Sequence, residues 1–169
     1  MKNMRKRFYA SSGRYQLLFE GNGGITQVFV NGSLAGESRY PYNRFYVELT
    51  PYLNYEQDND ILVVVKSLDL SSRWYVGSGI TRNVYLLQHH DLYIVPDSFK
   101  VTTLDVEDNN ALIRVEVDIQ NDTSYRVEDE LSFDTLIMGK YPITIAGHST
   151  YHFNKTFYLE NIKLWDEDH

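Results

Sequence analysis

The sequence of 169 residues contains no cysteine. This absence excludes a disulfide framework, a thiolate nucleophile and a cysteine-ligated zinc site from the chain. It also fits a reducing compartment. Because no apolar stretch of signal-peptide length follows the charged first residues, we expect a cytoplasmic protein.

Long hydrophobic runs and an excess of positive charge are also missing. No run approaches the roughly 20 apolar residues that span a bilayer, so we expect no membrane partner. The formal net charge is −7, which would repel a phosphate backbone, so we expect no nucleic-acid partner. The one basic cluster lies at an N-terminus that we expect to be frayed, and it comprises Lys2, Arg5, Lys6 and Arg7.

Aromatic residues are abundant, but unevenly so in kind. There are 14 Tyr and 8 Phe against only 2 Trp and 3 Met, a mixture that favours pleated, half-buried strands over helices. Hydrophobic residues make up 43% of the chain, which suffices for one large core or two small ones. The composition therefore predicts a folded β protein.

Short β-rich runs bounded by Gly, Pro, Asn and Asp recur along the chain, and no segment has the pattern of a long helix. In the clearest one, every second residue from Ala111 to Ile119 is apolar, whereas Arg114, Glu116 and Asp118 face the other way. The predicted strands cover residues 15–20, 25–30, 45–49, 61–65, 83–87, 92–95, 99–104, 111–119, 131–137, 141–145 and 151–159. This pattern predicts an all-β fold.

Two different β modules are expected. Residues 67–81 have no regular period, and their glycines permit irregular backbone, so this segment is predicted to be a long structured loop. After residues 83–87 the chain crosses His89, His90 and Asp91 and begins a second set of strands. We therefore place the modules at residues 1–90 and 91–169. The short strands and frequent turns of the second resemble an immunoglobulin-like sandwich.

Several motifs are specific enough to indicate a family. They occur in the order Phe19-Glu20-Gly21, Val28-Phe29-Val30-Asn31-Gly32, Gly36-Glu37 and Ser72-Arg73-Trp74-Tyr75-Val76-Gly77-Ser78-Gly79-Ile80-Thr81-Arg82-Asn83-Val84-Tyr85-Leu86. Downstream are Asp118-Ile119-Gln120-Asn121 and Ile162-Lys163-Leu164-Trp165-Asp166. Together these motifs resemble the sugar-binding jelly-roll domain and the following immunoglobulin-like domain of family 2 glycoside hydrolases of the β-galactosidase type.

This resemblance implies a truncated, galactose-binding-like jelly roll over residues 1–90, followed by an immunoglobulin-like β-sandwich over residues 91–169. It also implies a parent enzyme that hydrolyses terminal β-galactosides with retention, a reaction that needs two carboxylates about 5 Å apart. The family carries both in an (α/β)8 barrel that would follow His169, and no segment here has the strand and helix alternation of such a barrel. We therefore expect a non-catalytic N-terminal part with no catalytic residue, metal or cofactor, inactive alone.

Arg73 and Trp74 are the candidate substrate-binding residues. In the enzymes that the chain resembles, their loop approaches the mouth of the barrel, where an Arg fork or an indole face could meet sugar hydroxyls. The alternative is that Trp74 and Tyr75 pack in the jelly-roll core and Arg73 pairs with a carboxylate. We favour the alternative, because most such residues have that role.

Three further clusters have a structural explanation that we prefer to a functional one. Aromatic residues that could form a sugar platform are expected to pack in strands and turns: Tyr40, Tyr42, Phe45 and Tyr46. The His89-His90-Asp91 segment could hold a metal, but adjacent residues of an extended chain point to opposite sides, which favours a solvated linker. Acidic residues that match no calcium-loop spacing are expected to be solvated turns: Asp58, Asp60, Asp105, Glu107 and Asp108.

A rival function is a free-standing carbohydrate-binding or structural β-sandwich module, because fold alone does not define function. A binding module should present two or three coplanar aromatics to solvent, whereas an enzyme part should present an apolar patch. The expected partners are a β-galactoside-type carbohydrate, through the parent enzyme, and either a second copy or the missing part of the enzyme. A clipped sandwich would favour such pairing because it leaves strand edges unpaired.

Overall fold

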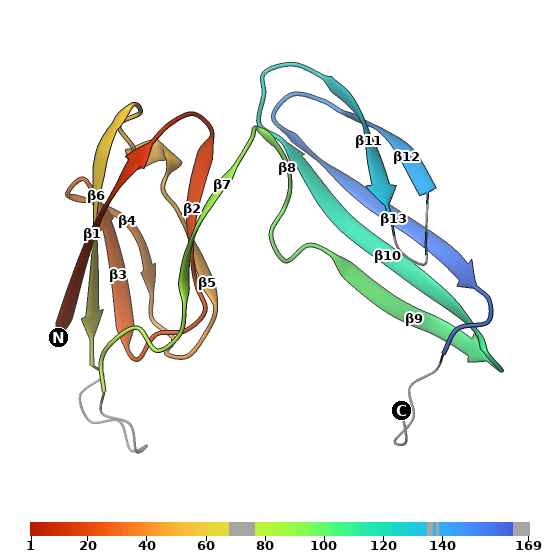
Figure 1. The fold of residues 1–169 in the computed structure, drawn as a ribbon, viewed down its shortest axis with the longest axis horizontal. Coiled ribbons are helices and arrows are strands. Elements are labelled where there is room, and N and C mark those ends of the chain that lie inside the picture. The colour runs from red at the N-terminus through yellow and green to blue at the C-terminus, as the bar shows by residue number, and fades with distance from the viewer. Residues whose placement is uncertain (68–76, 135–136, 138, 164–169) are drawn as a thin grey trace. The chain divides into compact units, whose positions relative to one another are not determined.

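The structure is a computed structural model that describes residues 1–67, 77–134, 137 and 139–163. The chain divides into two compact units, Met1–His90 and Asp91–His169. Strands dominate both units (Figure 1), which confirms the predicted all-β class. Within the described ranges, no helix has the length and apolar character needed to cross a membrane.

The first unit is a sandwich of two antiparallel sheets. Its elements are β1 (Lys2–Ala10), β2 (Arg14–Phe19), β3 (Ile25–Val30), β4 (Ser33–Ser38), β5 (Phe45–Glu48), a short 3-10 helix η1 (Thr50–Tyr52), β6 (Gln57–Lys66) and β7 (Val84–His89). One sheet has the strand order β1-β6-β3-β4, and the other has the order β5-β2-β7. Every pairing in them is antiparallel.

The core of this unit comes from strand alternation in both sheets. On β6, Ile61, Val63 and Val65 are buried, whereas the residues between them are only partly covered. They pack with apolar residues of β2, among them Leu17 and Phe19, because the two inner faces contribute to one cluster. The apolar period of two thus places one face of each sheet in the core.

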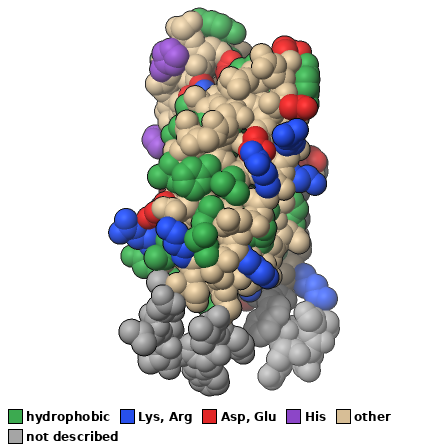
Figure 2. Space-filling view, turned by 90° about the vertical axis from the view of Figure 1, so that its left-hand side faces the viewer, with side chains coloured by type: hydrophobic (Ala, Val, Ile, Leu, Met, Phe, Trp, Pro, Cys, Tyr) green, Lys and Arg blue, Asp and Glu red, His purple; other side chains and the backbone are tan. Residues whose placement is uncertain are grey.

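The N-terminal segment is not frayed, contrary to the expectation from its charges. β1 pairs with β6 along its whole length, from Lys2 opposite Val65 to Ala10 opposite Gln57. On the outer face, Arg5 Nε lies 2.7 and 2.9 Å from the two carboxylate oxygens of Asp60. Figure 2, viewed from the side of β1, shows Lys and Arg side chains among exposed hydrophobic ones. The basic residues therefore belong to a sheet edge.

The second unit is built around one long strand. Its strands are β8 (Leu92–Ile94), β9 (Lys100–Glu107), β10 (Asn110–Asn121), β11 (Val127–Phe133), β12 (Gly139–Ile145) and β13 (Ser149–Leu159). β10 pairs with β13 on one side, and with β9 and then β8 on the other. The hairpin β11-β12 forms a second sheet, and buried Leu131, Ile143 and Ile145 share a core with Val115 and Val117 of β10.

The predicted alternation along residues 111–119 is confirmed: Ala111, Val115, Val117 and Ile119 are buried, and the charged residues between them are more exposed. The expected strand over residues 131–137 differs, since β11 begins at Val127 and ends at Phe133. Charged residues occupy the first half of β11, so that half has no alternation of apolar residues from which a strand could be predicted.

Asn121 is the last residue of β10. It is fully buried. Its Nδ2 donates to the carbonyl oxygens of Tyr125 at 2.9 Å, Ile145 at 3.2 Å and Ala146 at 3.1 Å. Its Oδ1 accepts from Thr123 N and Oγ1 at 3.0 and 2.7 Å. One amide therefore joins the turn after β10 to the end of β12.

We expect Asn121→Ala to destabilise the second unit by about 2–3 kcal/mol, because it leaves buried backbone carbonyls without a donor. The matched control is Asn154→Ala on the neighbouring β13, where an exposed side chain makes only a long 3.4 Å contact with Glu116. That change should stay within about 0.5 kcal/mol. Hydrogen exchange of the β10 and β13 amides measures both, and equal losses would contradict the prediction.

The ion pair between Arg5 and Asp60 predicts how the Asp60 carboxyl responds to pH. The hydrogen bonds of Arg5 to the Asp60 carboxylate lower the pKa of that carboxyl below its ordinary value of 3.8. Because the folded pKa is depressed, the contribution to stability is present above the unfolded pKa and is lost as pH falls through the folded one. An NMR titration should show Asp60 titrating below 3.8, and Arg5→Ala should raise its pKa. Arg39→Ala, which removes the partner of Glu37, should leave Asp60 unchanged.

Candidate functional site

The two predicted substrate-binding residues, Arg73 and Trp74, lie outside the described residues. The segment that follows them is described from Gly77 onward. The candidate site is therefore the set of loops around the segment that begins at Gly77. Residues 20–24, 39–44 and 77–83, here called the loop cluster, form that part of the first unit.

Backbone hydrogen bonds join the three loops. Gly23 N donates to Gly79 O at 2.7 Å, and Thr81 N donates to Gly21 O at 3.1 Å. The third loop is held by Tyr42 N, which donates to Asn22 O at 2.7 Å. Residues 20–24 thus lie between the other two loops and fix both of them.

Asn22 is the central side chain of the loop cluster. It is fully buried, and its Nδ2 donates to Gly24 O at 2.6 Å and to Thr26 Oγ1 at 2.5 Å. Its Oδ1 is also buried and has no hydrogen-bond partner among the described residues. The sequence reasoning did not single out Asn22. The glycines on both sides of it were the available signal, because such a string is typical of irregular backbone.

Glycine is required where these loops approach one another. A Cβ added to Gly24 would lie 2.2 Å from the carbonyl oxygen of Lys66, and its φ of +152° is one that side chains rarely adopt. A Cβ on Gly23 would lie 2.8 Å from the carbonyl oxygen of Gly77. The close packing that holds Gly77 therefore depends on residues without side chains.

The aromatic residues of the second loop and of the start of β5 divide into two kinds. Phe45 stacks on Phe19 with ring centroids 4.6 Å apart, so its expected packing role is confirmed. Tyr46 is half-buried, and its hydroxyl accepts from Arg44 at 2.8 Å. Tyr40 and Tyr42, by contrast, are 71% and 54% exposed, so for them the expected packing role is wrong.

Tyr42 also has an unusual backbone. Its φ is +66°, in the left-handed region that costs a residue with a Cβ about 1 kcal/mol or more. The hydrogen bond from its N–H to Asn22 O holds it there. Tyr42 therefore lies in an irregular turn together with Tyr40. The alternation of a regular strand does not apply to such a turn, so it does not predict which of its side chains are exposed.

The other sequence candidates lie elsewhere. His89 ends β7, so it belongs to a strand, while His90 and Asp91 follow it in the connection to β8. Among the described residues, no group of three or more His, Asp or Glu side chains could hold a metal ion. The acidic residues expected in turns belong mostly to strands, with Asp58 and Asp60 on β6 and Asp105 and Glu107 on β9.

The chemistry of the loop cluster favours binding over catalysis. Exposed Tyr40 and Tyr42 offer ring faces and hydroxyls, and the exposed guanidinium groups of Arg39 and Arg44 come from the same loop. The described part of the cluster contains a single carboxylate, Glu20. Retaining glycoside hydrolysis needs two carboxylates about 5 Å apart, so these residues do not provide its machinery.

Comparisons with known proteins show what the whole chain is similar to. No family model matches the chain. A β-galactosidase of Bacteroides ovatus is 32% identical over 110 residues, which are 64% of this chain and 13% of that protein. A β-galactosidase of Actinobacillus pleuropneumoniae is 28% identical over 159 residues, 92% of this chain and 15% of its own length. The chain therefore spans less than a fifth of these relatives.

Solved structures show the same fold. A glycosyl hydrolase family 2 member from Bacteroides cellulosilyticus superposes with a TM-score of 0.85 at 22% identity, covering 97% of this chain and 24% of that one. A Bacteroides uniformis β-glucuronidase gives a TM-score of 0.85 at 20% identity, covering 95% and 22%. The predicted resemblance is confirmed, since homologues and structural neighbours are glycoside hydrolases and each is matched over a small part.

The strained turn gives a prediction. Replacing Tyr42 by Gly removes the Cβ that disfavours its positive φ, whereas replacement by Ala keeps it, so Tyr42→Gly should be more stable than Tyr42→Ala by about 1 kcal/mol. At the exposed neighbour Tyr40, which lacks a positive φ, the order should reverse by about 0.5 kcal/mol. Urea denaturation of the four variants measures both differences. A preference for Ala at both positions would contradict the strain.

Proposed function

From this homology to a small part of family 2 glycoside hydrolases, we propose that the chain is a non-catalytic part of such an enzyme, of the β-galactosidase type. The observation that carries the proposal is that 92% of the chain aligns with only 15% of one β-galactosidase. The described residues form strands and one short 3-10 helix, without the alternating strands and helices of a catalytic barrel, which supports an accessory region. The parent enzyme would hydrolyse terminal β-galactosides with retention.

The loop cluster supports a role next to the substrate. Residues 20–24 hold Gly79 and Thr81 by backbone hydrogen bonds, and Gly23 packs closely against Gly77. Rigid loops position binding groups more accurately than mobile ones do. In this proposal the chain shapes the entrance through which a β-galactoside-type carbohydrate reaches the parent enzyme, and it supplies contacts without performing the reaction.

A free-standing carbohydrate-binding module is the second candidate, and one observation favours it. Tyr40 and Tyr42 expose 71% and 54% of their surfaces, and amphipathic aromatic rings are suited to stacking on sugar faces. Such a module would bind a sugar without the rest of an enzyme. The two candidates therefore differ in whether the isolated chain has measurable affinity for a sugar.

The test is to incubate the purified chain with a chromogenic β-galactoside and to titrate it with galactose and lactose by calorimetry. We expect no colour release above a matched blank, because two catalytic carboxylates are not provided. We also expect no saturable sugar binding, since the chain would supply only part of the site. Release of colour would overturn the proposal.

Binding without turnover would favour the second candidate, and variants then locate the site. Tyr40→Ala and Trp74→Ala should each weaken such binding if those rings carry it, by about 1–2 kcal/mol for a lost aromatic contact. Tyr158→Ala provides the matched control, because this tyrosine of the second unit is 61% exposed and lies outside the loop cluster.

A further inference from the structure

The dipeptide Asn-Gly occurs twice in the chain, as Asn22-Gly23 and as Asn31-Gly32. Asn-Gly is the dipeptide most prone to deamidation, because glycine has no side chain to shield its backbone nitrogen from the carboxamide carbon of the preceding asparagine. The two dipeptides have the same chemistry. Any difference in their reactivity therefore comes from the fold around them.

The first dipeptide, Asn22-Gly23, is enclosed by the loop cluster. Asn22 is fully buried, and its Nδ2 donates to Gly24 O at 2.6 Å and to Thr26 Oγ1 at 2.5 Å. The backbone nitrogen of Gly23, which is the group that would attack, donates to Gly79 O at 2.7 Å. These contacts restrict both the torsions of the dipeptide and its contact with water.

The second dipeptide, Asn31-Gly32, forms the two-residue turn of the hairpin β3-β4. Val30 and Ser33 pair on either side of it, and the φ angles of Asn31 and Gly32 are +49° and +86°, as in a type I′ turn. Asn31 is exposed, and a Cβ added to Gly32 would meet no atom within 4 Å. Both residues line a groove of about 440 Å³ on the outer face of the sheet, so water reaches this turn.

The Asn31 carboxamide joins the turn to two other segments. Its Nδ2 donates to Tyr52 O of η1 at 2.9 Å and to Oδ1 of buried Asn59 on β6 at 2.7 Å. Its Oδ1 accepts from Asp60 N at 3.0 Å. The NH2 group of Asn31 is thus the donor that connects the hairpin with η1.

We propose that Asn31 is a deamidation site of the folded chain, and that its conversion to a carboxylate detaches η1 from the hairpin β3-β4. The backbone nitrogen of Gly32 attacks Cγ of Asn31, the new C–N bond closes a succinimide ring, and the Cγ–Nδ2 bond breaks. Ammonia leaves with the proton of the Gly32 amide. Water then adds to one of the two ring carbonyls and opens the ring, which leaves an aspartate or an isoaspartate at position 31.

The hydrogen bonds of the carboxamide control the rate of this reaction. Cγ of Asn31 can meet Gly32 N only after Nδ2 has left its acceptors, so the reaction proceeds from a briefly opened turn. Opening an exposed turn costs less free energy than opening a buried segment. Asn31 therefore reacts more slowly than it does in an unfolded chain, but faster than Asn22 does in the folded one.

The product cannot restore the connection. A carboxylate at position 31 has no hydrogen to donate, so its oxygens face Tyr52 O and Asn59 Oδ1. Asn59 cannot compensate by turning its amide, because its Nδ2 already donates to Asn54 O at 2.8 Å and to Gln57 O at 3.0 Å. An isoaspartate would also add a backbone carbon to a turn of two residues, which disturbs the register of the hairpin.

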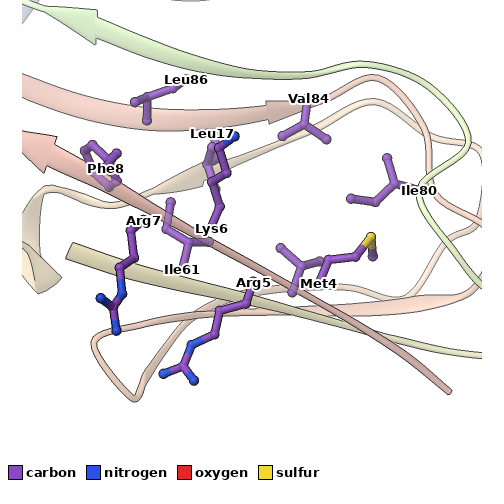
Figure 3. A pocket seen from close by; sticks show the side chains of 11 residues that line it. Met4, Arg5, Lys6, Arg7, Phe8, Leu17, Ile61, Ile80, Val84 and Leu86 are labelled. Atoms are coloured by element: carbon purple, nitrogen blue, oxygen red, sulfur yellow. The ribbon is translucent and has the colours of Figure 1, made fainter. Parts of the chain in front are cut away.

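Arg5 is the cation that lines the same groove, and it is already engaged. Figure 3 shows Arg5 and Phe8 on different sides of β1, so the guanidinium lies away from the core. Its Nε lies 2.7 and 2.9 Å from the carboxylate oxygens of Asp60. A new carboxylate at position 31 would have to compete with Asp60 for it. The reaction involves the first unit alone and is independent of the proposed enzymatic role.

The test incubates the folded chain in a mildly alkaline buffer, which favours attack by the amide nitrogen, and follows the mass gain from replacement of NH2 by OH. Trypsin releases residues 15–39 as one peptide, because no Lys or Arg lies between Arg14 and Arg39. Fragmentation assigns the gain to Asn22 or Asn31 in the same sample. We expect Asn31 to react at least about tenfold faster, a factor to which ~1.4 kcal/mol of difference in opening corresponds. In urea the two rates should become similar, and an unincubated sample corrects for reaction during digestion.

The variant Asn31→Asp reproduces one product and tests the structural consequence. It should raise the unfolding equilibrium constant of the first unit by about fivefold or more, the factor that corresponds to ~1 kcal/mol for one hydrogen bond. The amide of Tyr52, which donates to Leu49 O at 2.8 Å, should exchange its hydrogen faster as η1 loosens. Asn43→Asp makes the same charge change at an exposed asparagine of this unit, and should change the constant by no more than about twofold.

Three results would overturn the proposal. They are a rate at Asn22 equal to or above that at Asn31 in the folded chain, reaction of Asn31 in urea only, and unchanged exchange of the Tyr52 amide in Asn31→Asp. A mass gain selective for Asn31 in the folded chain, together with faster exchange at Tyr52 in this variant but not in Asn43→Asp, would support it.

Discussion

The first unit depends on the burial of one face of each sheet against the other. The alternation of Ile61, Val63 and Val65 on β6 with less buried residues fixes which side of the sheet is apolar, and a shift of register by one residue would turn that whole set to solvent. The pairing of β1 with β6 continues the same inward face, since Phe8 and Met4 pack against this core.

Strands could be predicted from the sequence wherever the residues of one face are all apolar. Strand β3 has the predicted bounds, residues 25–30, and β10 contains the predicted residues 111–119. β1 was missed because inward Lys6 interrupts the apolar period between Met4 and Phe8. β4 was missed for a related reason, since an edge strand with glycine at residue 36 has few apolar residues to form a pattern.

Hydrogen bonds between side chains and the backbone could not be predicted from the sequence in the same way. Asn22, Asn59 and Asn121 are fully buried, and each fixes loops through contacts that no period of hydrophobicity reports. The residue type alone does not predict these bonds, because Asn is also common in turns for several reasons. The positive φ of Tyr42 is likewise not reported by any period of hydrophobicity. The candidate site is therefore predictable as a loop, whereas its internal order requires the structure.

The contacts of Asn121 also bear on the order in which the second unit folds. Its amide bonds the carbonyl of Ile145, which lies 24 residues away in the sequence, so that bond cannot form until β11 and β12 have already turned back. The partners of β10 on β13 are further still, from Ser149 to Leu159. Contacts of such long sequence separation carry a loop-closure entropy that slows folding. The contacts of Asn121 with Thr123 and Tyr125 are local, whereas those with Ile145 and Ala146 require the β11-β12 hairpin to have closed.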